Sequence, residues 1–124
     1  MDIITLLIGM FTLHFIGDFI FQTRKMADNK SKSIFYLTLH VFWYSAAFMP
    51  TFLLIGIGVP YLKFIGVLFT THWITDFITS KITSYFWKKK RIKAFFNIIG
   101  FDQLIHIVTL LLIFKYFIHP IVFI

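Results

Sequence analysis

The segment "IITLLIGMFTLHFIGDFIFQ" (residues 3–22) indicates a membrane protein, because it is long and apolar enough to cross a bilayer as a helix. Such a helix needs about 20 predominantly apolar residues. This one also contains His14 and Asp18, four residues apart and therefore on one helical face. Ionisable side chains are costly within hydrocarbon, so their presence at this depth indicates a functional site.

The composition around this segment is that of an integral membrane protein. The chain has 124 residues, is 59% hydrophobic and 21% aromatic, and has a mean hydropathy of +0.86. Soluble domains average about 45–50% apolar residues. The length fits one domain, residues 1–124. Cysteine is absent from the sequence, which excludes disulfides and thiolate metal sites.

Four stretches are apolar enough to predict membrane spans, so we expect an all-α membrane protein with four transmembrane helices. Pro50 predicts a kink in the second helix and Pro120 predicts the end of the fourth. The expected spans are residues 3–22, 34–56, 60–86 and 98–118.

The basic residues predict the orientation of these helices. Of the 12 Lys and Arg residues, nine lie in "TRKMADNKSK" (23–32) and "KKKRIK" (88–93). By the positive-inside rule, we expect a multi-pass protein of the inner (cytoplasmic) cell membrane. Its basic loops, residues 23–32 and 88–97, would be cytoplasmic, with both termini on the outer side. The net charge of +7 then reflects contact with anionic membrane lipid, and no nucleic-acid partner is expected.

Two similar segments indicate an internal repeat. The sequence "HFIGDFIFQT" (14–23) resembles "HWITDFITSK" (72–81), with His, Ile, Asp, Phe and Ile at matching positions. The chain could therefore consist of two repeated helical hairpins; chance similarity between Phe- and Ile-rich helices is the alternative. Gly9 and Gly17 could allow a close helix contact.

Seven ionisable side chains are expected to meet in one layer of the bilayer. Three helices carry a His/Asp pair at i, i+4 spacing, and the second helix carries one further histidine. In each pair the aspartate is nearer the basic loops and the histidine lies about 6 Å deeper, at about 1.5 Å per residue. The seven residues are His14, Asp18, His40, His72, Asp76, Asp102 and His106.

This layer predicts a divalent metal site. Lys and Arg are not expected within it, so its carboxylates need protons, imidazolium or a bound cation. His nitrogens and Asp oxygens suit zinc as first choice, or Mn, Fe or Ni. The set is large enough for one metal, or for two sharing a bridging carboxylate. Asp18 or Asp102 could act as the general base, and Gln22 and Gln103 could support the ligands.

The sequence is compatible with three functions. The first is a metal-dependent, membrane-embedded hydrolase acting on a lipid or headgroup linkage, with the basic loops attracting anionic substrate. The second is a small transporter or proton/ion channel, formed as a homo-oligomer because four short helices enclose little space. The third is a non-enzymatic accessory protein whose polar layer only fixes helix packing.

The polar motifs also carry a family resemblance. The stretches "HFIGDFIFQT", "LHVFWYSAAF", "HWITDFITS" and "FDQLIHI" resemble the small membrane proteins of domain-of-unknown-function family 3307. The resemblance covers nearly the whole chain and includes all seven polar positions. It implies a bacterial or phage source and a bacterial inner membrane, and it implies no activity. More loosely, the His/Asp-rich helices resemble bacterial inner-membrane proteins described as metal-dependent hydrolases, a likeness that does not define a reaction.

Overall fold

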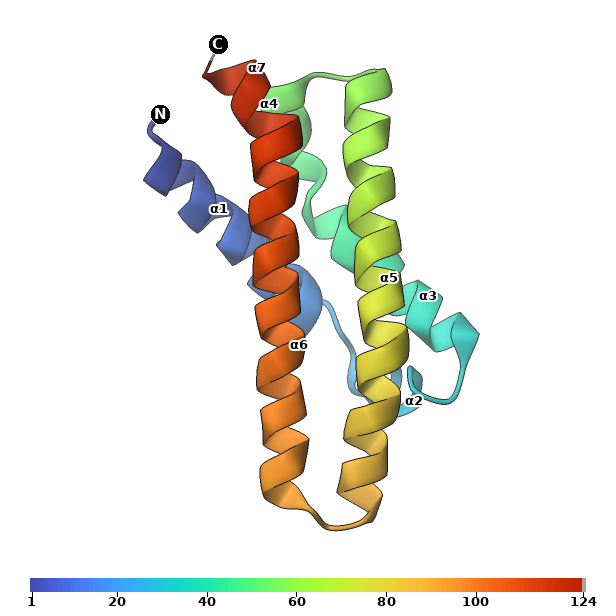
Figure 1. The fold of residues 1–124 in the computed structure, drawn as a ribbon. Helices are drawn as coiled ribbons and strands as arrows, with labels where there is room; N and C mark the ends of the chain where they lie inside the picture. Colours follow the sequence, from blue (N-terminus) through green and yellow to red (C-terminus); the bar gives the residue numbers. More distant parts are fainter. Residues whose placement is uncertain (124) are drawn as a thin grey trace.

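The computed structural model describes residues 1–123, and every regular element in that range is helical (Figure 1). The first half of the chain forms α1 (Ile3–Phe15), the π-helical turn η1 (Ile16–Ile20), α2 (Arg24–Asn29), α3 (Ile34–Ala47), the 3-10 turn η2 (Met49–Thr51) and α4 (Phe52–Ile55). The second half forms α5 (Val59–Lys88), α6 (Ile92–Ile113), the π-helical turn η3 (Phe114–Ile118) and α7 (His119–Val122).

Short polar side chains begin the helices of the first half. Asp2, Thr23 and Ser33 each accept a hydrogen bond from the backbone N–H three residues later, at the start of α1, α2 and α3. These bonds satisfy backbone donors that have no partner within the helix. At Asp2, which is exposed, the Thr5 amide also holds the carboxyl pKa below its usual value.

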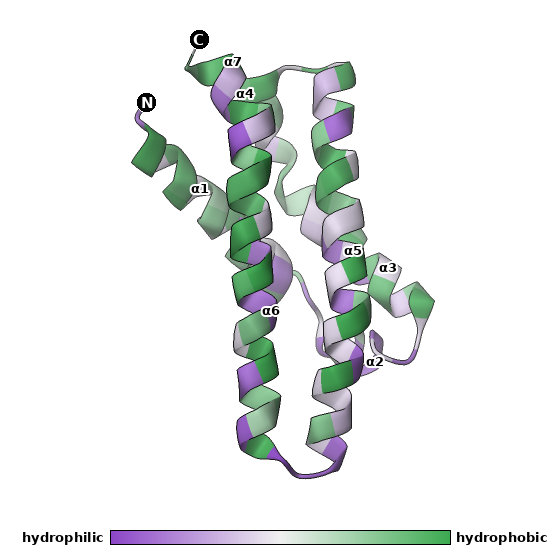
Figure 2. Ribbon diagram, viewed as in Figure 1, coloured by the Kyte–Doolittle hydropathy of each residue, from purple (hydrophilic) through white to green (hydrophobic). Residues whose placement is uncertain are grey.

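The helices place the basic segments at one end of the molecule and both termini at the other (Figure 1). Helices α5 and α6 form a long antiparallel hairpin, and α1 and α3 lean against it. The α5–α6 turn is tight because Lys90 adopts a left-handed conformation (φ 56°) and Arg91 N–H donates to the Phe86 carbonyl. Hydrophilic residues gather at this turn and around α2, and also midway along α5 and α6 (Figure 2).

Three helices are long and apolar enough to cross a membrane: Ile3–Ile20, Ile34–Ile55 and Ile92–Val122. Helix α5 is 30 residues long but is not among them. It carries Lys63, His72, Asp76 and Lys81, which lower its hydropathy. The predicted all-helical architecture is therefore confirmed, whereas four spans remain a proposal.

Several predicted boundaries were wrong. The basic loops are shorter than expected, because Arg24–Asn29 forms α2 and helix α6 already begins at Ile92. Pro120 does not end the last helix. It lies in the first turn of α7, where a missing N–H is tolerated, and the helical path continues to Val122. Pro50 interrupts the second helix as predicted, within the turn η2.

The apolar core lies on the side of the polar layer that faces the termini. On α1 and α5 the core residues precede His14 and His72 in the chain. On α3 and α6, which run in the opposite direction, they follow His40 and His106. They include Leu6, Met10, Phe48, Phe64, Leu68, Leu110 and Ile113. The molecule is thus divided into an apolar half and a polar half that adjoins the basic loops.

Candidate metal centre

Asp18 reaches the interior because the first helix changes its winding at η1. Within this turn Phe21 N–H donates to the Ile16 carbonyl at 2.8 Å, five residues back. Gly17 and Asp18 are both buried there. A β-carbon on Gly17 would lie only 2.9 Å from the Tyr44 ring and 3.0 Å from the Tyr44 carbonyl. The close approach of η1 to α3 therefore depends on glycine, and it carries Asp18 into the centre.

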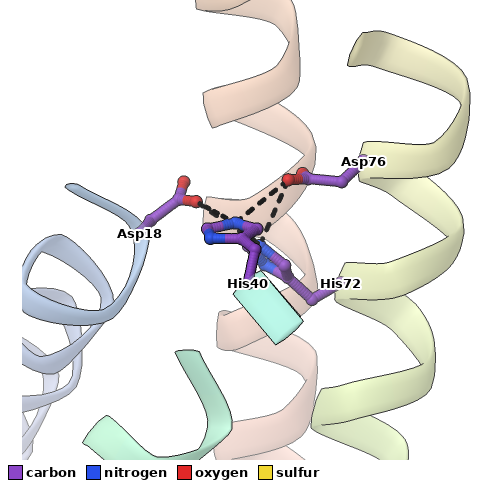
Figure 3. Close-up of side chains that lie close together, drawn as sticks. All are labelled: Asp18, His40, His72 and Asp76. Atoms are coloured by element: carbon purple, nitrogen blue, oxygen red, sulfur yellow. Dashed lines mark hydrogen bonds and ion pairs between the residues drawn. The ribbon is translucent and has the colours of Figure 1, made fainter. Parts of the chain in front are cut away.

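Four buried side chains from three segments converge on one point: Asp18 from η1, His40 from α3, and His72 and Asp76 from α5 (Figure 3). His40 Nε2 lies 3.1 Å from Asp18 Oδ1 and 3.2 Å from Asp76 Oδ2. His72 Nε2 lies 3.4 and 3.6 Å from the same two oxygens. The two Nε2 atoms are 3.2 Å apart. The four atoms thus form a compact cage of two nitrogens and two oxygens.

These five distances are close to the edges of a metal coordination tetrahedron, and three of them are slightly shorter. With metal–ligand bonds of about 2.0–2.2 Å, neighbouring ligand atoms in a regular tetrahedron are about 3.3–3.6 Å apart. The five distances given above span 3.1–3.6 Å. Two imidazole nitrogens and two carboxylate oxygens are also a donor set that zinc accepts. The residues therefore fit a divalent ion in both spacing and chemistry.

Each carboxylate uses its second oxygen outside this cage. Asp18 Oδ2 accepts a hydrogen bond of 2.9 Å from Gln103 Nε2, and Asp76 Oδ1 lies 3.0 Å from His106 Nε2. His106 Nε2 is also 3.4 Å from Asp102 Oδ2. A nitrogen between two carboxylates acts as a donor. Such contacts orient metal-binding carboxylates, which leaves one oxygen of each directed into the cage.

Ring stacking fixes His72. Its imidazole lies between the Tyr44 ring, at a centroid distance of 3.7 Å and an interplanar angle of 19°, and the His106 ring, at 4.1 Å and 17°. Within residues 1–123, the buried Nδ1 atoms of His40 and His72 have no hydrogen-bond partner. The orientation of His72 therefore depends on its aromatic neighbours rather than on a hydrogen bond to Nδ1.

A lysine enters the polar layer, contrary to the expectation from the sequence. Lys30 Nζ lies 2.9 Å from Asp76 Oδ2. Lys30 reaches this position because the turn after α2 folds back against α5 instead of extending along the membrane surface. Burial alone would lower the pKa of Lys30, but Asp76 and Asp18 outweigh that effect and raise it above its usual value. Lys30 is therefore an ammonium ion at neutral pH.

All seven predicted site residues lie in this one centre. Asp18, Asp102 and His106 form a second group of mutually close ligand atoms. In this arrangement His14 is not placed as a metal ligand. Its Nδ1 lies 3.0 Å from the Tyr44 hydroxyl and its Nε2 lies 2.9 Å from Gln103 Oε1, so partners occupy both nitrogens.

The supporting amides behave differently from each other. Gln103 contacts His14, Asp18 and Asp102, as expected for a residue that orients ligands. Gln22 borders the site without touching a ligand, and its buried Oε1 has no partner in the described part of the chain. The sequence did not predict that Lys30, Tyr44 and Thr79 contact the residues of the centre. The hydroxyl of Thr79 lies 2.5 Å from Asp102 Oδ1, and no spacing rule in the sequence identifies such contacts.

Two adjoining cavities lie between the centre and the basic end of the molecule. The inner cavity, of about 220 Å³, is bordered by Asp18 and Asp102, among other residues. The outer cavity, of about 840 Å³, lies among α2, the end of α5 and the start of α6. Five residues border both cavities: Ala27, Lys30, Ser80, Thr83 and Phe95. The two cavities therefore lie against the same side chains, one on the carboxylate side and one on the basic side.

The fold and the site define a small helical protein with three helices apolar enough to cross a membrane and a buried His/Asp cluster that could hold a metal ion. The chain belongs to the family described as proteins of unknown function (DUF3307), whose profile matches residues 6–122. Comparison with the curated proteins and with the solved structures gives no match.

Proposed function

We propose that this protein is a membrane-embedded, metal-dependent hydrolase that acts on a lipid or headgroup linkage. The observation that carries the proposal is the tetrahedral spacing of Asp18, His40, His72 and Asp76, with distances of 3.1–3.6 Å between donor atoms. Helix α5 supplies two of these ligands and joins the two ends of the molecule. It therefore crosses the bilayer as a fourth span, sheltered by its neighbours.

Charge balance favours one divalent ion, and zinc is our first choice. The centre contains three carboxylates, Asp18, Asp76 and Asp102, and one ammonium ion, Lys30. Together, these three carboxylates and the ammonium ion carry a charge of −2. A single divalent cation neutralises it, whereas two would leave an excess of positive charge in a buried site.

The inner cavity defines where the chemistry takes place. A bound divalent ion supplies Lewis acidity and lowers the pKa of a water molecule. Asp102 borders the cavity and lies outside the four-residue cage, so it is the better placed of the two predicted bases to accept the proton from that water. Asp18 then acts as a ligand, and Gln103 holds both carboxylates in place.

Elemental analysis of the purified protein tests the metal site. We expect about one transition-metal atom per chain in the wild type and almost none in Asp76→Asn, because the amide replaces a charged ligand. Asp28→Asn is the matched control, since Asp28 is exposed, pairs with Arg24 and is not part of the cage. Equal metal content in the two variants would exclude the site.

The reaction is tested by incubating the protein with a membrane lipid extract and following lipid species by mass spectrometry. We expect Asp102→Asn to retain the metal and lose turnover, and His72→Ala to lose both while remaining folded. Proton flux in liposomes without stoichiometric metal would instead support the alternative of an oligomeric transporter or channel. An intact function after paired His and Asp replacement by apolar residues would support a purely structural role.

A further inference from the structure

The outer cavity has the charge of an anion-binding site. Its border carries the basic residues Arg24, Lys30, Lys32 and Lys88 and the acidic residue Asp28. Arg24 pairs with Asp28 at 3.7 Å, and Lys30 pairs with Asp76 at 2.9 Å. Within residues 1–123, neither Lys32 nor Lys88 forms an ion pair. Two uncompensated ammonium groups therefore border the same hollow.

The cavity also offers an unused hydrogen-bonding group. Ser80 borders both cavities and is 6% exposed, and its hydroxyl has no partner in the part of the chain that the structure describes. A buried polar group without a partner is unfavourable, so it marks a place where a ligand or water completes the bonding. Ser80 therefore lines both the cavity that carries the lysines and the cavity that carries the carboxylates.

Aromatic side chains give the cavity an amphipathic character. Trp87 and Phe96, which are 58% and 60% exposed, border the cavity beside Lys88 and Lys32. Indole rings and lysines are typical of the membrane interface, where apolar chains meet charged headgroups. The volume of about 840 Å³ lies within the usual range of about 300–1,000 Å³ for small-molecule sites. A lipid headgroup fits this combination better than a free anion.

We propose that the outer cavity binds the phosphate group of an anionic lipid, with Lys32, Lys88 and Ser80 as its contacts, and presents the adjoining linkage to the inner cavity. This inference deepens the proposed function by naming its substrate class. Binding itself needs only the basic residues and the hydroxyl, so it can be measured separately from metal content and turnover.

Native mass spectrometry of the full chain in detergent tests the lysines, with short-chain phosphatidic acid as the probe and phosphatidylcholine as the comparison. We expect the double variant Lys32→Gln/Lys88→Gln to bind phosphatidic acid about 30-fold more weakly, since each lysine near an anionic group contributes about five-fold. The control Lys63→Gln/Lys115→Gln changes the net charge equally but lies at the opposite end, so binding should change less than about two-fold. Equal losses in both variants, or equal binding of phosphatidylcholine, would overturn the proposal.

A second pair of variants tests the hydroxyl. We expect Ser80→Ala to weaken binding of phosphatidic acid by about 10- to 100-fold, the usual size of a hydrogen bond to a charged group. Ser45→Ala is a matched control, because Ser45 is also buried with an unpartnered hydroxyl but does not border either cavity. Equal effects of the two substitutions would contradict the assignment of Ser80.

Inorganic phosphate distinguishes the two sources of the group. Retention of phosphatidic acid against excess inorganic phosphate supports the lipid headgroup as the ligand. Displacement of phosphatidic acid by inorganic phosphate at comparable concentrations would refute the lipid as the ligand. Free phosphate would then be the ligand of the same residues. Lipid binding by a metal-free, inactive protein would refute the proposed hydrolase while this inference stands. Lipid hydrolysis unaffected by Lys32→Gln/Lys88→Gln would refute this inference while the hydrolase stands.

Discussion

Lys30 competes with any cation for the same oxygen of Asp76. Its ammonium lies 2.9 Å from Oδ2, the atom that also faces His40 and His72. In a metal-free centre this contact partly neutralises the buried carboxylates. In a metal-bound centre, the ammonium and the ion repel each other at short range, even at an effective dielectric constant of about 20. Lys30 would therefore lower the affinity of the proposed site for a metal, while its ammonium partly neutralises the buried carboxylates.

Lys30→Gln should consequently raise the affinity for the metal, by about 10-fold or more, because a repulsive charge is removed. The measurement is competitive titration with a chromophoric chelator. Lys32→Gln serves as the control, since Lys32 borders the outer cavity without touching the cage. A lower affinity in Lys30→Gln would show that the lysine supports the metal instead of opposing it.

Tyr44 has two separable contacts in the centre. Its hydroxyl lies 3.0 Å from His14 Nδ1, and its ring stacks on His72. Tyr44→Phe removes only the first contact, so we expect normal metal content and a loss of about 1–3 kcal/mol of stability from the unpartnered buried nitrogen. Thermal unfolding in detergent measures the loss, and the exposed Tyr116→Phe is the control. A metal-depleted Tyr44→Phe would contradict this division.

At the scale of single residues, the sequence predicted the histidines and aspartates but not their partners. The i, i+4 spacing and the distance from the basic loops were enough to place His72, Asp76 and His106 in one layer. Lys30 could not be placed, because its position depends on how a loop folds back. Tyr44 could not be distinguished from a packing residue, because an aromatic side chain in an apolar helix has the same pattern in either role.

Among the elements, the π-helical turn η1 joins a close helix contact to the position of a candidate metal ligand. It brings Gly17 against α3 and turns the next residue, Asp18, toward His40 and His72. Hydropathy identified this helix along its length but carried no signal for the altered winding. The contact of Gly17 was anticipated as one of two candidates; Gly9 has no heavy atom within 4 Å of an added β-carbon.

Gly17→Ala should therefore destabilise the protein by about 1–3 kcal/mol, because the new methyl group overlaps Tyr44 and Ala47. It should also reduce metal content, since η1 can relieve the overlap only by moving Asp18. Gly9→Ala faces open space and should leave both properties unchanged. Unfolding curves and elemental analysis on the same preparations provide the comparison, and equal behaviour of the two variants would refute the proposed coupling.

Over the whole molecule, the two ends differ in charge and the two halves differ in polarity. The termini and the α4–α5 connection lie at one end, and α2 and the α5–α6 turn lie at the other (Figure 1). The all-helical architecture was predictable from the apolar runs. The predicted crossing of residues 60–86 and the cytoplasmic position of the basic end remain predictions, because α5 is not among the helices that are apolar enough by composition to cross a membrane.

The orientation can be tested without background labelling, because the chain has no cysteine. We expect Lys89→Cys, in the α5–α6 turn, to react with a membrane-impermeant maleimide only from the cytoplasmic side. Ile57→Cys, in the exposed α4–α5 connection, should react only from the other side. Labelling of both positions from the same side would exclude the crossing of α5.

X-ray absorption spectroscopy of the purified protein at the metal edge tests whether Asp18, His40, His72 and Asp76 bind a metal ion. We predict one metal per chain with about four nitrogen and oxygen ligands at about 2.0–2.1 Å. Two of these ligands should give the outer-shell scattering of imidazole, and His40→Ala should remove one of them. A hydrated ion without imidazole scattering, or a spectrum unchanged by His40→Ala, would contradict the account.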